Sequence, residues 1–185
     1  TFIPEKDGHS HTSDLVKQII NMNNGKYLEE LLEDTTPTSF CVGVAGYPEK
    51  HNEAPNRHVD LENLKLKVDS GASYIVTQMF FDNSKFFRFR DECKAIGINV
   101  PVIPGIKPIS ALNDIRMLPQ TFHIDVPNDL VNAIKKCTTD KDAREVGIEW
   151  AIMQSKELIS KGVPGIHYYT LGRSDNVARI VRASF

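Results

Sequence analysis

Cysteine is scarce in this sequence: Cys41, Cys93 and Cys137 are the only three among 185 residues. They are odd in number and widely spaced, and no CxxC pair occurs. This pattern argues against a disulfide framework and against a zinc ribbon. We therefore expect three buried or partly buried thiols in a protein of the reducing cytoplasm.

Strong net charge and long apolar runs are also missing. The formal net charge is −2 and no basic block appears, so nucleic acid is not an expected partner. The longest apolar run, around residues 40–45, is far too short to span a bilayer, so no membrane partner is expected. No basic-then-apolar signal segment follows Thr1. With 41% hydrophobic and 25% charged residues, the composition is typical of a globular protein.

Several motifs of well-known sites are absent. Gly43-Val-Ala-Gly46 is not the GxGxxG turn of dinucleotide-binding folds, and no GxxxxGK[ST] loop is present. No Ser-His-Asp or Cys-His nucleophile signature appears. His9-Ser-His11 lacks further ligands at zinc-like spacing, so no metal is expected.

What the sequence does contain is a regular alternation of strands and helices. Apolar and β-branched runs predict strands, and amphipathic periodicity predicts helices. The predicted strands are 40–46, 74–80, 100–106 and 166–171. The predicted helical segments are 13–23, 27–33, 60–71, 84–95 (capped by Ser84), one after Ser110, one opened by Pro127, 142–161 and 175–183.

This order predicts an α/β fold with four adjacent parallel strands joined by right-handed crossovers. A (βα)8 TIM barrel needs eight strands and about 250 residues, so the chain supplies about the last four strands and their helices. A small open sheet with helices on both faces is the alternative. A half barrel leaves strand edges unpaired.

Polar residues cluster where ligands bind in such folds. Asp60, Asn63 and Lys67 share one face of a predicted helix, near its start, which suits a diphosphate, with Asp60 accepting from a sugar hydroxyl. A solvated charged face gives the same spacing. Gln78 is an amide in an apolar strand and must be hydrogen-bonded, either structurally or to a ligand. Arg173 is either a surface arginine or a partner for a carboxylate.

Three segments stand out. They are the stretch from Val44-Ala-Gly-Tyr-Pro-Glu-Lys-His-Asn-Glu-Ala-Pro to Thr77-Gln-Met-Phe-Phe-Asp82, then Pro104-Gly-Ile-Lys-Pro108, then Tyr169-Thr-Leu-Gly-Arg173. They resemble segments of methylenetetrahydrofolate reductases, in the same order as in that family, within a likeness covering about residues 10–182. The resemblance implies FAD contacts at Thr12, Tyr47, His51, Ala54, Asp60, Asn63 and Lys67, and substrate contacts at Gln78, Tyr169 and Arg173. Leu66 stands where many members carry an arginine, Gly172 where most carry asparagine, and Asp114 where some carry a substrate-contacting glutamine.

The resemblance also implies a function. It is reduction of 5,10-methylenetetrahydrofolate to 5-methyltetrahydrofolate by NADH or NADPH through FAD, in one-carbon metabolism and methionine biosynthesis. The family's general-acid glutamate belongs to an early strand, outside this chain, so no catalytic residue is assigned. We expect residues 1–185 to form the C-terminal portion of one catalytic domain, and the complete protein to be a homo-oligomer. The alternative is a non-catalytic half barrel or binding module that needs a second segment for activity.

Overall fold

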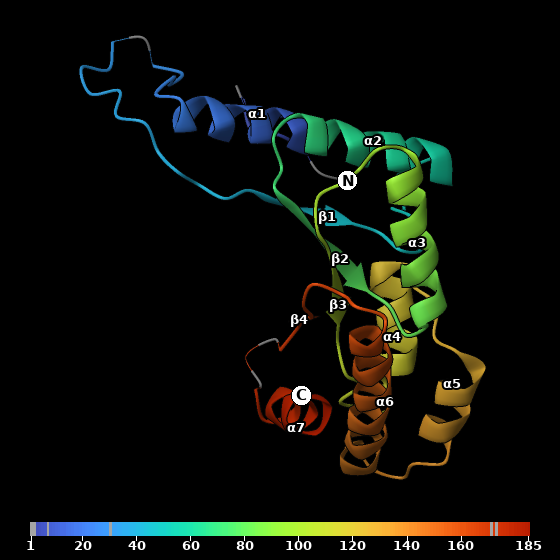
Figure 1. The fold of residues 1–185 in the computed structure, drawn as a ribbon. Coiled ribbons are helices and arrows are strands. Elements are labelled where there is room, and N and C mark those ends of the chain that lie inside the picture. The colour runs from blue at the N-terminus through green and yellow to red at the C-terminus, as the bar shows by residue number, and fades with distance from the viewer. Residues whose placement is uncertain (1–2, 7, 30, 171, 173) are drawn as a thin grey trace.

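Four short strands form one parallel sheet whose spatial order follows the chain (Figure 1). The computed structural model describes residues 3–6, 8–29, 31–170, 172 and 174–185. The strands are β1 (Gly43–Gly46), β2 (Tyr74–Met79), β3 (Val102–Ile106) and β4 (His167–Tyr168). Each pairs in parallel with the next, from Gly43 opposite Tyr74 to Ile106 opposite Tyr168. The predicted parallel order is therefore confirmed, although every strand is shorter than expected.

Helices precede, separate and follow the strands. They are α1 (Thr12–Asn23), α2 (Arg57–Asp69), α3 (Asn83–Ala95), α4 (Asp114–Phe122), α5 (Asn128–Lys135), α6 (Asp140–Ser160) and α7 (Asp175–Ser184). Their starts have local causes. Asn56 caps α2 by accepting from the Val59 N–H, and Thr139 and Asp142 form a capping box on α6. The cap of α3 is Asp82, which accepts from the Ser84 N–H, so the prediction that Ser84 is the cap was wrong.

One face of the sheet carries the main core. Val44, Ile75 and Ile106 of the strands pack in one cluster with apolar residues of α2, α3, α6 and α7. On the opposite face, Gly43 and Ala45 are exposed and the corresponding side chains of β2 are half-buried. Among the described residues the sheet is thus covered on one face, as expected for part of a barrel rather than for an open sheet with helices on both faces.

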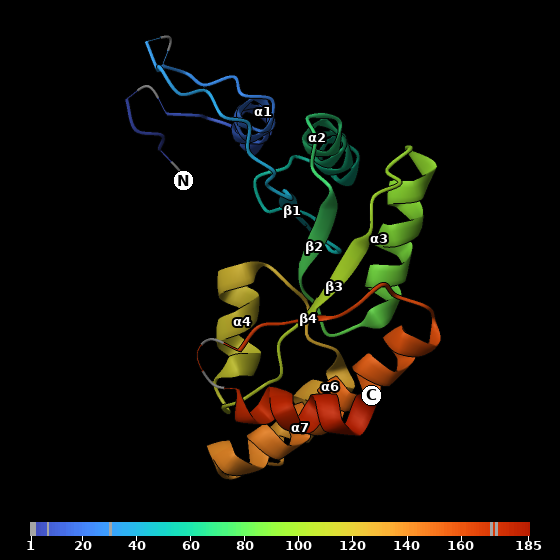
Figure 2. The same ribbon diagram turned by 60° about the vertical axis from the view of Figure 1, so that its left-hand side comes forward.

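A second core lies beyond the carboxyl ends of the strands. Met79, Phe81 and Ile109, which end or follow β2 and β3, pack there with residues of α4, α5 and α6. Figure 2 shows α4 and α6 on the opposite side of the sheet's strand ends from α1 and α2. The close packing requires glycine at position 147 of α6, because a Cβ there would lie 2.1 Å from the Ile109 carbonyl oxygen.

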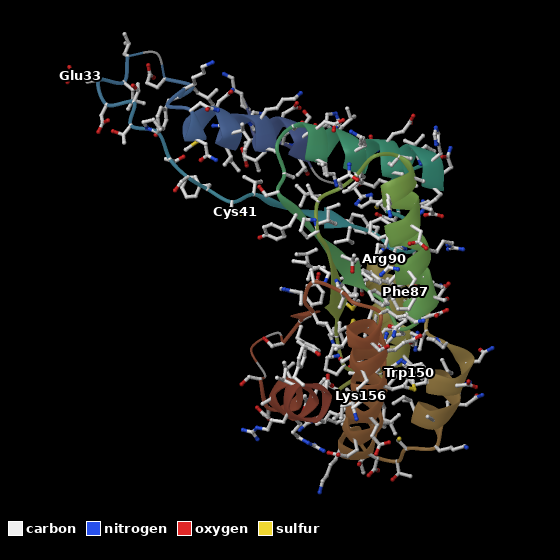
Figure 3. All side chains as sticks on the ribbon, viewed as in Figure 1. Glu33, Cys41, Phe87, Arg90, Trp150 and Lys156 are labelled. Atoms are coloured by element: carbon white, nitrogen blue, oxygen red, sulfur yellow. The ribbon has the colours of Figure 1, made fainter. Side chains whose placement is uncertain are left out.

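Three predictions about the segment before β1 were wrong. The described part of 27–33 is not helical, and Leu28 and Leu31 are 74% and 88% exposed, so no packed face supports a helix there. The strand predicted from residue 40 begins at Gly43. Phe40 is 58% exposed. Cys41, on the segment that leads into β1, is also exposed (Figure 3), so the expectation of a buried or partly buried thiol was wrong at this position. Cys93 is buried and Cys137 half-buried, as expected.

Candidate functional site

A cavity of about 570 Å³ lies between the start of α1, the loop after β1 and one face of α2. This size is within the usual range for cofactor and small-molecule sites. All seven residues for which the resemblance implies FAD contacts line it: Thr12, Tyr47, His51, Ala54, Asp60, Asn63 and Lys67. The structure thus brings together side chains that are up to 55 positions apart in the sequence.

Arg57, the first residue of α2, holds the loop after β1 in place. Its Nη1 donates to the Tyr47 carbonyl oxygen at 2.5 Å and lies 3.6 Å from Asp60 Oδ2. Its Nε donates to Glu92 of α3 at 2.8 Å, and the guanidinium lies 5.0 Å from the centroid of the Phe89 ring. Arg57 was not predicted as a site residue, since nothing in the sequence shows that Glu92 lies beside it.

Lys50 lies in the same loop and forms hydrogen bonds with the loop's backbone. Its backbone φ is 115°, a conformation that non-glycine residues rarely adopt. Its ammonium group donates to the carbonyl oxygens of His51 at 2.8 Å and of Ala54 at 2.6 Å. These bonds offset the local strain and fix the two cavity-lining residues that they join.

The polar face of α2 forms one wall of the cavity. Asp60 is 8% exposed, and its Oδ2 accepts from the His51 N–H at 3.2 Å. Lys67 Nζ donates to the Ala45 carbonyl oxygen at 3.2 Å, and burial lowers the pKa of this lysine, with Asp60 opposing the effect. The expected position near the helix start is correct for Asp60, but α2 begins at Arg57 and Lys67 lies in its last turn. The dipole of the α2 N-terminus therefore does not act at Lys67.

The N-terminal end of α1 forms part of the cavity lining. Its N-cap residue, His11, makes no side-chain capping bond, and Ser10, His11, Thr12 and Ser13 all line the cavity. The first backbone N–H groups of a helix have no partner within the helix. This end of α1 can therefore donate to an anion in the cavity, across from Lys67.

Two aromatic rings mark the boundary between the cavity and the carboxyl end of the sheet. The rings of Tyr47 and His51 meet edge to face, with centroids 4.5 Å apart. Burial raises the pKa of Tyr47, and the negative charges of Asp60 and Glu53 raise it further. Tyr47 is therefore a neutral hydrogen-bonding group at physiological pH.

Gln78 and Tyr169 lie outside this cavity, at the ends of β2 and β4. Gln78 Oε1 accepts from the Met79 N–H at 2.9 Å, and its side chain lines a small crevice that Tyr47 also lines. The Tyr169 hydroxyl donates to the Thr77 carbonyl oxygen at 2.9 Å. Arg173, the third residue predicted to contact the substrate, lies outside the described residues.

Asp114 is the first residue of α4, and its carboxylate accepts hydrogen bonds from the turn that precedes the helix. Its Oδ2 accepts from the N–H groups of Ser110 at 2.8 Å and Ala111 at 3.2 Å, and lies 3.8 Å from Lys107 Nζ. The buried carboxylate thus orders the connection from β3 to α4.

Two kinds of feature are absent from the part of the chain that the structure describes. No helix in it is long and apolar enough to cross a membrane. Within the same residues, no group of three or more His, Cys, Asp or Glu side chains is placed to hold a metal ion.

Curated methylenetetrahydrofolate reductases are similar to this chain in sequence. The chain is 33% identical over 177 residues to methylenetetrahydrofolate reductase 1 of Schizosaccharomyces pombe, covering 95% of the chain and 27% of that protein. It is 39% identical over 137 residues to 5,10-methylenetetrahydrofolate reductase of Escherichia coli, covering 74% and 46% respectively. The chain thus spans less than half the length of these curated relatives.

A solved structure shows the same fold. It is described as an uncharacterized protein from Clostridium thermocellum that binds two copies of 5-methyl-5,6,7,8-tetrahydrofolic acid. The TM-score is 0.52 at 18% identity, over 78% of this chain and 52% of that one. The sequence model of the family described as methylenetetrahydrofolate reductase matches residues 2–184. This chain is therefore a member of the methylenetetrahydrofolate reductase family.

Proposed function

We propose that this chain is the C-terminal part of a (βα)8 barrel that reduces 5,10-methylenetetrahydrofolate to 5-methyltetrahydrofolate with NADH or NADPH, using FAD. Family membership supports the reaction, and the sheet covered on one face supports the barrel. The solved structure of the same fold is described as a folate-binding protein, which agrees with the proposed substrate class.

The observation that carries the proposal is the gathering of all seven candidate FAD residues around one cavity. The chemistry of its lining fits the adenosine diphosphate half of the cofactor. Lys67 and the uncapped start of α1 provide a charge and N–H donors for a diphosphate. Asn63 and Asp60 provide an amide and a carboxylate for sugar hydroxyls.

When bound, FAD supplies the hydride transfer that no side chain can perform. The protein's contribution is orientation. Tyr47 and His51 form an aromatic wall, and Arg57 and Lys50 fix the loop that carries it. Gln78 would donate from its amide to the nicotinamide and the pterin in turn, and Arg173 would pair with the folate tail.

The direct test is titration of the purified chain with FAD, FMN and riboflavin, followed by flavin fluorescence. Because the cavity has donors for a diphosphate, we expect FAD to bind more tightly than riboflavin by at least about tenfold, which corresponds to one charge-assisted hydrogen bond. ADP should compete with FAD. Equal affinity for all three flavins, or no competition by ADP, would contradict the assignment of the cavity.

A second candidate function is a binding module without turnover. It is the alternative that the residues left open, since the resemblance implies no catalytic residue within this chain. Turnover should be assayed with the chain alone and with the chain joined to the first strands of a related barrel. FAD binding without turnover in either form would favour the binding module.

A further inference from the structure

The hydrogen-bond ladder between β2 and β3 is interrupted near the proposed substrate side. Val76 pairs with Ile103, but Met79 pairs with Gly105, so β2 contains one residue more than β3 in this stretch. The Ile75 N–H donates to the Pro101 carbonyl oxygen and the Gly105 N–H donates to Thr77, so residues 101 and 105 face β2 on the two sides of the interruption. An extra residue of this kind in one strand is a β-bulge.

Three hydrogen bonds that involve side chains occur at this interruption. The Gly105 N–H donates to Thr77 Oγ1 at 2.9 Å. The Tyr169 hydroxyl donates to the Thr77 carbonyl oxygen at 2.9 Å, and the Met79 N–H donates to Gln78 Oε1 at 2.9 Å. Thr77 therefore links β2 to β3 through its side chain and to β4 through its carbonyl group.

The side chains and backbone around Thr77 are closely packed. Thr77 is fully buried, with 0% of its surface exposed. A Cβ on Gly105 would lie 2.2 Å from the Thr77 carbonyl oxygen and 2.7 Å from the Tyr169 ring. Position 105 therefore has no room for a side chain, and Thr77, Gly105 and Tyr169 are closely packed at the ends of the three strands.

The geometry determines how Gln78 presents its amide. Gln78 lies within the interrupted stretch, and bulges re-aim the side chains they contain. An N–H can be accepted only by the amide oxygen, so the Met79 N–H fixes which end of the amide is Oε1. The NH₂ end is then the end that points away from the strand and can donate to a ligand.

We propose that Thr77 is the positioning residue for Gln78: its hydroxyl and carbonyl group hold the bulge that directs the Gln78 amide toward the substrate. This inference rests on the proposed function for the identity of the substrate. It also gives Tyr169 a role through Thr77, since its hydroxyl is already engaged there.

The test uses Thr77→Val, which keeps the shape but removes the acceptor for the Gly105 N–H, and Thr77→Ser, which restores it. In the complete barrel, Thr77→Val should slow flavin reduction by the nicotinamide and reoxidation by the folate by about tenfold or more, the value of one hydrogen bond. FAD affinity should stay within about twofold, because no cavity residue is changed. Thr77→Ser should recover most of both rates.

A double-mutant cycle separates positioning from general stability. If Thr77 acts through Gln78, Thr77→Val should have no further effect on either rate in the Gln78→Ala background. An equal loss in both backgrounds, or unchanged rates in Thr77→Val alone, would overturn the proposal.

The role of Thr77 can be tested even if the proposed function fails. In that case the wild-type barrel shows no turnover, and nuclear magnetic resonance of the isotope-labelled chain decides about Thr77. Thr77→Val should shift the Gln78 side-chain NH₂ resonances and speed hydrogen exchange at Met79 and Gly105, whereas Thr77→Ser should not. Unchanged resonances and exchange in Thr77→Val would refute the positioning role.

Discussion

The half-buried ammonium group of Lys67 is the cation that the described wall of the cavity offers to a ligand. Replacing Lys67 by Ala should weaken FAD binding by about 10–100-fold, because a charge-assisted hydrogen bond to the diphosphate contributes about 1.5–3 kcal/mol. With leucine at position 66, the neighbouring side chain cannot compensate. Equilibrium flavin titration in the complete barrel measures the effect.

The matched control for Lys67 is Lys65→Ala on the same helix. Lys65 pairs with Asp69 and does not line the cavity, so its loss should leave FAD affinity unchanged. If Lys67→Ala behaves like Lys65→Ala, then Lys67 belongs to a solvated charged face, as its spacing alone also allowed.

The three thiols should differ in reactivity. Cys41 is exposed and Cys137 half-buried, whereas Cys93 is buried and burial raises its pKa to about 12. Because the thiolate is the reactive form, iodoacetamide at neutral pH should label Cys41 first and leave Cys93 unlabelled. Mass spectrometry of samples taken at successive times measures the order of labelling. In urea, which unfolds the protein, all three thiols should react with iodoacetamide. Fast labelling of Cys93 in the folded protein would contradict its placement.

At the scale of elements, α6 is tied to the turn between β2 and α3 by a buried amide. Gln154 Nε2 donates to the Phe80 carbonyl oxygen at 3.2 Å and to Asn83 Oδ1 at 3.1 Å. Gln154→Leu would leave both oxygens without this donor, so the free energy of unfolding should fall by about 1–3 kcal/mol. Urea unfolding measures it, and Met153→Leu, at a position 54% exposed, serves as the control. Equal stability of the two variants would refute the role of the amide.

Strands and long helices were predictable from the sequence because burial imposes a regular pattern on them. The buried positions of β2 alternate along Tyr74–Met79, and the 21 residues of α6 repeat buried positions at helical spacing over several turns. The segment 27–33 has an amphipathic pattern as well. Seven residues are too few to form a helix without a packed face, and the sequence does not show that this face lacks a partner.

The cavity was predictable only through family likeness, since the spacing of Asp60, Asn63 and Lys67 alone favours a solvated charged face. The supporting contacts were not predictable. Arg57 meets Glu92 across 35 positions, and Tyr169 meets Thr77 across 92. Such pairs depend on how the helices and strands pack, which a single sequence does not reveal.

At the scale of the whole molecule, the protein should lose stability at alkaline pH. Burial raises the pKa of Cys93 from 9.0 to about 12, and it also raises the pKa values of Tyr168 and Tyr169. These groups ionise at lower pH in the unfolded chain than in the folded one. Stability is therefore fully present below pH 9 and falls as the pH rises toward 12.

The contribution of Cys93 to this loss is at most about 4 kcal/mol. Urea unfolding midpoints measured between pH 8 and about 10.5 should fall with pH, and Cys93→Ala should make the decline shallower. Cys41→Ala, which removes the exposed thiol, is the control. A decline with the same slope in Cys93→Ala would show that the buried thiol does not contribute.

The bond from Tyr169 to Thr77 also has a consequence for the order in which the protein is made. The two residues are 92 positions apart, so at about 5–20 residues per second Tyr169 is synthesised about 5–18 s after Thr77. The residues proposed to hold FAD all lie between Thr12 and Lys67 and leave the ribosome long before Tyr169 does. A nascent chain therefore completes its share of the cofactor cavity first. It acquires a correctly aimed Gln78 only after Tyr169 has also been synthesised.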